Sequence, residues 1–400
     1  MIVTKSDISA RRDVAGPAGL LGFRSVSGLR TGDGRRVADR TLFRSATPQF
    51  VDAADARRFV DQTGLRQIVD LRLDYEAATE GSGGFDRTDV VIRNIPFAIR
   101  TPVAEGSAVA PMPGADPLVA TYLGYLVARQ AFPELVASLL ADDGLPTLVH
   151  CTMDKDRTGV AIAVLLDAIG VLRHDICDNY AQRADDIEIM MHRLREMASY
   201  GDAVDVYPPE AMQVDPATVL RFLAWIDLRH SGSREWLASV GITHEQFVEL
   251  EQRLMEDDMT ATSTQVLRSV VLPAAPEEVW ALVGDTGGVH RWIPGIASSS
   301  VEGDIRTAIF DDGSPAHERI VEHDDKRRTY TYTYLDGPIP LDSYESTITV
   351  GPELDGDGSL VVWNATLSAT PEVVEAVEGL YDAGIARLQE IFASQGHLSK

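Results

Sequence analysis

The chain has 400 residues, 44% of them hydrophobic and 24% charged, and its 36 Lys and Arg face 61 Asp and Glu, a formal net charge of −25. This composition excludes an intrinsically disordered protein, and the length predicts two domains. The negative charge argues against nucleic acid or an anionic membrane surface as a partner, so an anionic substrate requires a local group of cations.

Few residues of the chain suit a disulfide or metal framework. Cys151 and Cys177 are its two cysteines, too few for either, and Cys177 is expected to be a buried thiol. The first residues lack the apolar core of a signal peptide, and no run of about 18 apolar residues occurs. We therefore expect a cytoplasmic protein with no membrane insertion, no cofactor and no metal.

The first half of the chain mixes predicted strands and helices. Apolar runs bounded by turns predict strands at 66–72, 89–97 and 146–150. Asp116 followed by Pro117 is typical of a helix N-terminus and predicts a helix over 117–130. The segment 158–170 is apolar nearly all round and ends at Gly170, which indicates a buried helix.

The second half changes character after an acidic stretch. Residues 175–257 read as helical, and 255–264 is polar without periodicity, so we place domains at residues 1–257 and 258–400. Beyond this boundary, alternating Tyr and Thr in 329–334 predict an antiparallel strand, and an apolar stripe in 371–393 predicts a long terminal helix. The expected fold is an α/β domain, with a central sheet flanked by helices, plus an α+β domain whose antiparallel sheet wraps the C-terminal helix.

One short segment, "HCTMDKDRTG" at 150–159, carries the chemistry. A strand, a loop and a helix in succession aim backbone N–H groups at an anion, and the same helix dipole favours the thiolate of Cys151 as a nucleophile. Arg157 can bind two phosphoryl oxygens, and Thr158 can donate its hydroxyl to the departing thiolate. His150 is expected to order the loop. The alternative is a structural cysteine beside a surface arginine.

This segment resembles the signature HC-x-x-G-K-D-R-T-G of the atypical bacterial tyrosine phosphatases, and the resemblance covers most of residues 15–255. Those enzymes act on phosphotyrosine and, in some cases, phosphoinositides. The resemblance implies a metal-independent phosphatase with a cysteinyl-phosphate intermediate, Cys151 as nucleophile and Lys155 as an auxiliary cation. It places phosphate binding on the loop residues Thr152, Met153, Asp154, Lys155, Asp156 and Arg157.

The aspartates of the loop raise separate questions. Asp154 stands where the family has glycine, so either it points outward and alters substrate choice, or the loop is impaired and the domain only binds; we favour retained catalysis. Asp156 fits the signature and is the candidate general acid or a helix cap, with Asp154, Asp70 and Asp116 as further candidates. Arg44 and Arg72 either support the loop or form ordinary salt bridges.

The C-terminal region resembles the SRPBCC (START-like, polyketide cyclase type) domains over 264–397. That resemblance implies a helix-grip fold enclosing an apolar cavity that binds a hydrophobic small molecule, although each aromatic there could equally be a core residue. The candidate cavity residues are Trp280, Trp292, Tyr332, Tyr334, Tyr344 and Trp363. The expected partners are therefore a phosphorylated substrate and an apolar ligand.

Two other functions remain open at this point. The same chemistry could act on a small phosphorylated metabolite of a biosynthetic pathway, or the chain could be a pseudophosphatase that binds both ligands without turnover.

Overall fold

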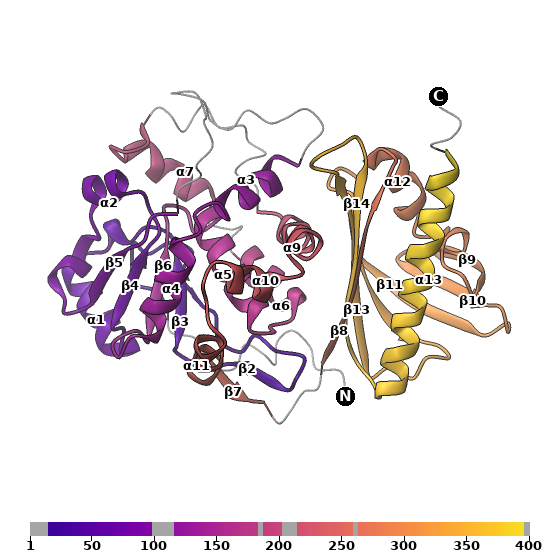
Figure 1. The fold of residues 1–400 in the computed structure, drawn as a ribbon, viewed down its shortest axis with the longest axis horizontal. Coiled ribbons are helices and arrows are strands. Elements are labelled where there is room, and N and C mark those ends of the chain that lie inside the picture. Colours follow the sequence, from indigo (N-terminus) through magenta and orange to yellow (C-terminus); the bar gives the residue numbers. More distant parts are fainter. Residues whose placement is uncertain (1–14, 98–115, 183–186, 202–213, 259–262, 396–400) are drawn as a thin grey trace.

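The structure is a computed structural model that describes residues 15–97, 116–182, 187–201, 214–258 and 263–395. Two layered units lie side by side, an N-terminal sheet covered by helices and a C-terminal sheet with one long helix on its far face (Figure 1). Within the described residues, no helix is both long and apolar enough to span a bilayer.

The N-terminal unit is built on a five-stranded sheet of order β1-β3-β6-β4-β5, in which β3, β6, β4 and β5 run parallel. The order places β6 in the centre. The strands are β1 (Arg24–Ser25), β3 (Leu42–Ser45), β4 (Gln67–Asp70), β5 (Val91–Asn94) and β6 (Thr147–His150), with β2 (Arg35–Val37) and β7 (Met255–Asp257) paired separately. The helices are η2 (Pro48–Phe50), α1 (Ala53–Thr63), α2 (Asp74–Glu80), η3 (Gly83–Arg87), α3 (Pro117–Tyr125), α4 (Ala131–Leu140), α5 (Asp156–Ala168), α6 (Arg173–Ala181), α7 (Ile187–Glu196), α9 (Pro216–His230), α10 (Ser233–Ser239) and α11 (His244–Leu254).

The predicted N-terminal elements are present with shorter bounds. β4, β5 and β6 confirm the strands, and Asp116 caps α3 by accepting a hydrogen bond from the Val119 N–H. The prediction of one helix over 117–130 is wrong, because α3 ends at Tyr125. Backbone bonds from residue i to i−3 replace the helical pattern after Gly124, and the chain turns before α4. The acidic segment after 254 is also partly ordered, since β7 pairs with β2.

Helix α5 is buried on nearly every side, as its composition predicts. It packs against the sheet, α3, α6, α9 and α10. Gly159 in its first turns lies so close to Tyr180 that an added Cβ would come within 2.9 Å of the ring, so glycine is required there. The tyrosine hydroxyl meets that of Tyr122 at 2.6 Å, which ties α6 to α3.

The C-terminal unit is a seven-stranded antiparallel sheet of order β8-β14-β13-β12-β11-β10-β9 with α13 packed on it. This arrangement confirms the expected helix-grip architecture. Its elements are β8 (Thr264–Leu272), α12 (Pro276–Val283), η6 (Val289–Arg291), β9 (Ile296–Glu302), β10 (Ile305–Phe310), β11 (Pro315–Asp324), β12 (Thr329–Asp336), β13 (Ser343–Pro352), β14 (Ser359–Ser368) and α13 (Pro371–Gln395).

The other face of this sheet packs against α6 and α9 of the N-terminal unit (Figure 1). Leu360 and Val362 on β14 belong to the same buried cluster as the apolar side chains of α9 and α5. Arg221 of α9 donates to the Thr349 hydroxyl on β13 at 2.7 Å, and Gly351 leaves room for its side chain, because a Cβ there would lie 2.5 Å from Arg221 Cδ. The two units therefore share one continuous core.

Candidate active site

The loop 151–155 leaves the C-terminal end of the central strand β6 and enters α5 at Asp156. His150 ends the strand between Ser45 of β3 and Asp70 of β4. Ligands commonly bind at the carboxyl edge of parallel strands, and the free N–H groups at the α5 N-terminus point to that edge. Cys151 is only 2% exposed and Arg157 9%, so the two candidate groups lie at the base of the site.

Arg157 is held by a buried glutamate from another element. Its Nη1 donates to Glu76 Oε2 at 2.6 Å and its Nη2 to Glu76 Oε1 at 3.1 Å, an end-on bidentate pair. Nη2 also lies 3.0 Å from the hydroxyls of Thr152 and Tyr200. A guanidinium carries five N–H donors, so this clamp leaves donors for a phosphoryl group and fixes the plane in which they lie.

Glu76 is the centre of this network, and the sequence analysis missed it. Its Oε1 also accepts from the Tyr200 hydroxyl at 2.5 Å and from Thr152 Oγ1 at 3.1 Å. Burial alone would raise the pKa of the Glu76 carboxyl, but Arg157 and Tyr200 lower it below its ordinary value, so the carboxyl is ionised. Burial likewise opposes the charge on Arg157, yet Tyr200, Glu76 and Cys151 raise the pKa of the guanidinium well above its usual value.

Two tyrosines flank this buried group. Tyr200 follows α7, and burial raises its pKa, so it stays a neutral phenol. Tyr125 at the end of α3 is half-buried, and burial raises its pKa too, with Arg157, Asp156 and Cys151 among its charged neighbours. Met153 packs on the far side in a small apolar cluster with Met190 and Leu194 of α7. Aromatic and thioether side chains thus lie beside the loop.

Asp154 adopts a backbone φ of +55°, the left-handed conformation that a glycine takes most easily. Its carboxylate is fully buried and binds two arginines: Arg44 Nε donates to Oδ1 at 2.9 Å, and Arg24 pairs with Oδ2. The expectation that Asp154 points outward is therefore wrong. The side chain points into the protein, because these two cations compensate its burial.

Asp156 is the first residue of α5, and its side chain is 32% exposed. Its Oδ1 accepts a hydrogen bond from Lys155 Nζ at 2.8 Å. Of the four carboxylates considered from the sequence, it alone keeps both exposure and a place on the loop. The lysine is itself buried, with its ammonium held over the start of the helix.

Asp70 and Arg72 form a separate buried pair beside the loop. Arg72 Nη2 lies 2.6 Å from Asp70 Oδ2, and Arg72 also donates to the Thr47 hydroxyl and the Gly81 carbonyl. Burial would raise the pKa of Asp70, but His150 and Arg72 lower it, so the carboxyl does not hold a proton for transfer. This pair supports the strand ends, and the candidacy of Asp70 as the acid is wrong, since it is committed to Arg72.

The remaining predicted residues have these positions. His150 Nδ1 lies 3.1 Å from the Cys151 carbonyl and its Nε2 3.7 Å from Asp70 Oδ1, and burial lowers its pKa, so it is neutral. Thr158 is fully buried, with no partner for its hydroxyl among the described residues. Asp116 is bound to Arg221 at 2.6 Å and to the helix it caps, so its candidacy as the acid is also wrong.

Cys177 on α6 is a buried free thiol whose pKa burial raises, as expected of a structural cysteine. In the ranges that the structure describes, no three His, Cys, Asp or Glu side chains come together as metal ligands do.

The C-terminal unit encloses a small cavity of about 50 Å³ between the sheet and α13. Its wall includes Tyr332, Tyr334, Tyr344 and Trp363 of the six aromatics proposed from the sequence. Trp280 and Trp292 lie in the core beside it instead: Trp280 donates its indole N–H to Asp325, and Trp292 packs edge-on against Trp363.

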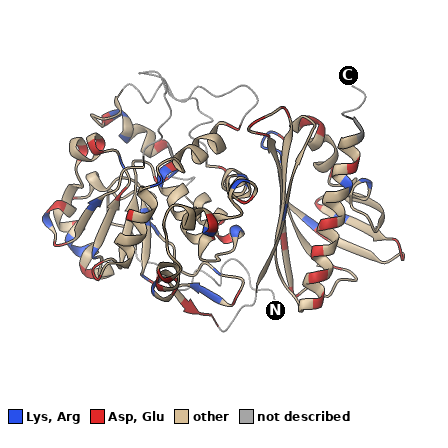
Figure 2. Ribbon diagram, in the orientation of Figure 1, with Lys and Arg blue, Asp and Glu red and all other residues tan. Residues whose placement is uncertain are grey.

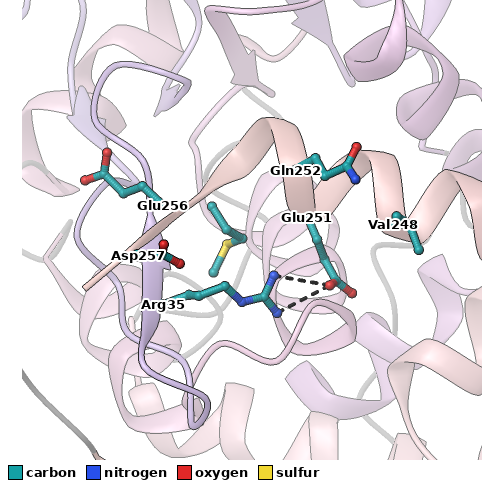
Figure 3. Close-up of a pocket in the computed structure, with 7 residues that line it drawn as sticks. Arg35, Val248, Glu251, Gln252, Glu256 and Asp257 are labelled. Carbon is teal, nitrogen blue, oxygen red and sulfur yellow. Dashed lines mark hydrogen bonds and ion pairs between the residues drawn. The ribbon is translucent and has the colours of Figure 1, made fainter. Parts of the chain in front are cut away.

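A larger hollow of about 450 Å³ lies on the surface between β2, β7 and α11 (Figure 3). Arg35 in it donates to Glu251 at 3.2 Å and also pairs with Asp33. Glu256 and Asp257 add negative charge, so the hollow does not suit a phosphate group, and it contains no residue of the loop 150–159.

The chain is similar to known phosphatases over this N-terminal unit. A family model described as "Tyrosine phosphatase family" matches residues 18–256. A protein of Cupriavidus necator, named among the tyrosine-protein phosphatases, is 30% identical over 211 residues, which are 51% of this chain and 75% of the relative. A tyrosine-protein phosphatase of Nostoc commune is 30% identical over 146 residues, 35% of this chain and 49% of its own length.

The C-terminal unit has its own matches. A model described as "Polyketide cyclase / dehydrase and lipid transport" matches residues 263–393. The solved structure of XoxI from Bacillus cereus is 32% identical and covers 33% of this chain and 98% of its own, with a TM-score of 0.32. Both resemblances expected from the sequence are thereby confirmed. Since the first model covers more than half of the chain, the protein belongs to the tyrosine phosphatase family and is a phosphatase with a C-terminal ligand-binding domain.

Proposed function

We propose that the N-terminal domain hydrolyses aryl phosphate monoesters, phosphotyrosine in proteins above all, through a cysteinyl-phosphate and without a metal, and that the C-terminal domain binds a hydrophobic small molecule. The observation that carries the proposal is the pairing of Cys151 and Arg157 on one loop at a helix N-terminus, with the arginine clamped by Glu76. These groups supply a nucleophile and an oriented set of N–H donors for a phosphoryl group.

In the first step the Cys151 thiolate attacks phosphorus. The S–P bond forms as the bond to the aryl oxygen breaks, and Arg157 with the loop N–H groups holds the equatorial oxygens. The aryl oxygen takes its proton from Asp156 at the start of α5. Aryl esters suit this step best, because a phenol needs little protonation to leave.

In the second step water attacks the cysteinyl-phosphate. Asp156 accepts a proton from the water, the S–P bond breaks, and phosphate leaves. The Thr158 hydroxyl, which has no other partner in the described structure, donates to the returning thiolate. This assigns a use to a buried hydroxyl that would otherwise destabilise the fold.

The walls of the site favour an aromatic ester. Tyr125, Tyr200 and Met153 border the loop, and the depth of Cys151 suits a long aryl phosphate better than a short phosphoserine. Figure 2 shows acidic residues spread over both domains, so a dianionic substrate depends on the local N–H donors of Arg157 and the α5 N-terminus for its attraction.

We also propose that the domains meet near residues 257 and 258 and that the protein acts in the cytoplasm. The two buried free cysteines support a reducing compartment.

The proposal predicts that the purified full-length chain hydrolyses para-nitrophenyl phosphate and phosphotyrosine peptides with kcat/KM at least about 100-fold above that for phosphoserine peptides, a difference within reach of one well-formed pocket. Vanadate should inhibit the reaction, and EDTA should leave it unchanged. The measurement is steady-state release of phosphate.

Sugar and nucleoside phosphates provide the comparison substrates. Preference for one of these over the aryl esters would favour a metabolite phosphatase. Binding of tungstate without any turnover would favour the pseudophosphatase and contradict the proposal.

Glu76→Gln tests the clamp. The amide keeps the shape but removes the buried counter-charge and donates an N–H toward Arg157, so the guanidinium loses its fixed plane, and we expect kcat to fall about 10- to 100-fold together with a loss of stability. Glu80→Gln, a nearby change on the same helix outside the clamp, is the matched control. An unchanged kcat in Glu76→Gln would show that the loop alone orients Arg157.

A further inference from the structure

The cavity of the C-terminal domain contains a buried ion pair in an otherwise apolar wall. Arg306 of β10 is 1% exposed, and its Nε donates to Glu318 Oε2 of β11 at 2.6 Å. Its guanidinium carbon stands 4.3 Å from the centre of the Tyr332 ring, a cation–π contact. Both charged residues line the cavity, together with Phe310, Tyr344, Trp363, Val377 and Leu380.

Arg306 is incompletely satisfied. Among the described residues its Nη1 is buried without a hydrogen-bond partner, and so is the hydroxyl of Tyr330 on β12, on the other side of β11. Arg173, buried at the start of α6 in the N-terminal unit, shows the contrast, since Asp167 and Asp227 both bind it. A buried N–H without an acceptor is destabilising unless a bound group fills the place.

The charges around Arg306 indicate what kind of bound group could accept its free N–H. Burial alone would lower the pKa of Arg306, but Glu318 raises it, so the guanidinium stays charged. Because Glu318 already neutralises that charge, a neutral acceptor oxygen is sufficient and a full negative charge is not required.

We propose that this cavity binds an aromatic molecule carrying a hydrogen-bond-accepting oxygen, a carbonyl or a carboxylate, which Arg306 Nη1 binds while the ring packs among Tyr332, Tyr344 and Trp363. The inference rests on the ligand-binding part of the proposed function and adds the chemistry of the ligand.

The cavity must widen to admit such a molecule. Its 50 Å³ is enough for a few water molecules, whereas sites for drug-sized ligands have about 300 Å³ or more. Ile339 and Leu341, from the segment between β12 and β13, close part of the wall, and the Ile339 N–H is held by the Tyr334 hydroxyl at 3.1 Å. Because the cavity is small, monocyclic probes are the appropriate first ligands.

Three probes of similar size separate the contribution of ring packing from that of the hydrogen bond to Arg306. They are acetophenone with a neutral carbonyl, benzoate with a carboxylate, and ethylbenzene with no acceptor. Ligand-observed NMR titrations of the full-length chain should give a Kd for acetophenone or benzoate about tenfold or more below that for ethylbenzene.

The variant Arg306→Met leaves Glu318 buried without its partner and can fail to fold, so the paired variant Arg306→Met/Glu318→Gln is tested beside it. In the paired variant we expect ethylbenzene binding to remain and the preference for an acceptor to disappear. Arg268→Met, which removes an arginine bound to Asp382 outside the cavity, is the matched control and should keep the preference.

Persistence of the preference in the paired variant, equal binding of ethylbenzene by the native chain, or no binding of any probe would each overturn the inference. Hydrolysis of para-nitrophenyl phosphate is measured on the same samples. Absence of the preference in the native chain with hydrolysis intact counts against this inference alone, and absence of hydrolysis with the preference present counts against the phosphatase mechanism alone.

Discussion

Cys151→Ser is expected to abolish hydrolysis of para-nitrophenyl phosphate, a loss on the order of 10⁶-fold in kcat, the size seen when a covalent nucleophile is removed. Serine keeps the volume and the loop geometry at this buried position, but its hydroxyl does not ionise at neutral pH. Tungstate should still bind, because Arg157 and the α5 N-terminus are unchanged. Steady-state kinetics measures the loss of kcat, and isothermal titration calorimetry measures the binding of tungstate.

Cys177→Ser is the matched control for that experiment. Cys177 is the other buried cysteine of the chain, lies on α6 and contributes nothing to the loop, so its replacement should leave kcat as it is. Turnover by Cys151→Ser at the rate of the native chain would overturn the assignment of the nucleophile.

Asp154→Gly, which installs the residue of the family signature, is expected to lower the free energy of unfolding by about 3–5 kcal/mol and not to raise kcat. Glycine accepts the φ of +55° without strain, so the change isolates the loss of the carboxylate from Arg24 and Arg44. Urea unfolding followed by fluorescence measures the stability. A rise in kcat at unchanged stability would mean that the carboxylate faces the phosphate.

The double variant Arg44→Met/Asp154→Gly provides the control. Removing Arg44 together with Asp154 leaves Arg24 as the one arginine that has lost this carboxylate instead of two, so the pair should be less destabilised than the sum of the single variants.

The nucleophile and arginine could be predicted because they belong to one short segment. Glu76 could not, since it lies 81 residues from Arg157 in an acidic stretch that has the composition of an exposed helix. The buried position of Asp154 could not be predicted for the same reason. Its partner Arg44 is 110 residues away, and only the packing of β3 beside β6 brings the two together. Local patterns report chemistry along the chain, whereas ion pairs across the fold depend on its topology.

The architecture was easier to predict than the bounds of its elements. Alternation in 329–334 identified β12, while the continuous apolar run in β14 has a different cause: Leu360 and Val362 face the phosphatase and Val361 and Trp363 face the cavity. A strand buried on both faces has no polar side, so its hydrophobic pattern does not indicate which element packs against each face.

That two-sided strand has a consequence for how the protein unfolds. Since β14 contributes to the cores of both domains, neither domain can lose its structure without exposing apolar surface of the other, and the chain should melt as a single cooperative unit. Cutting it near residue 257 would uncover the apolar faces of α9 and β14 together. We therefore expect the lifetime of the phosphatase in the cell to depend on its companion domain, and a small molecule bound in the distant cavity would then set how much enzyme persists.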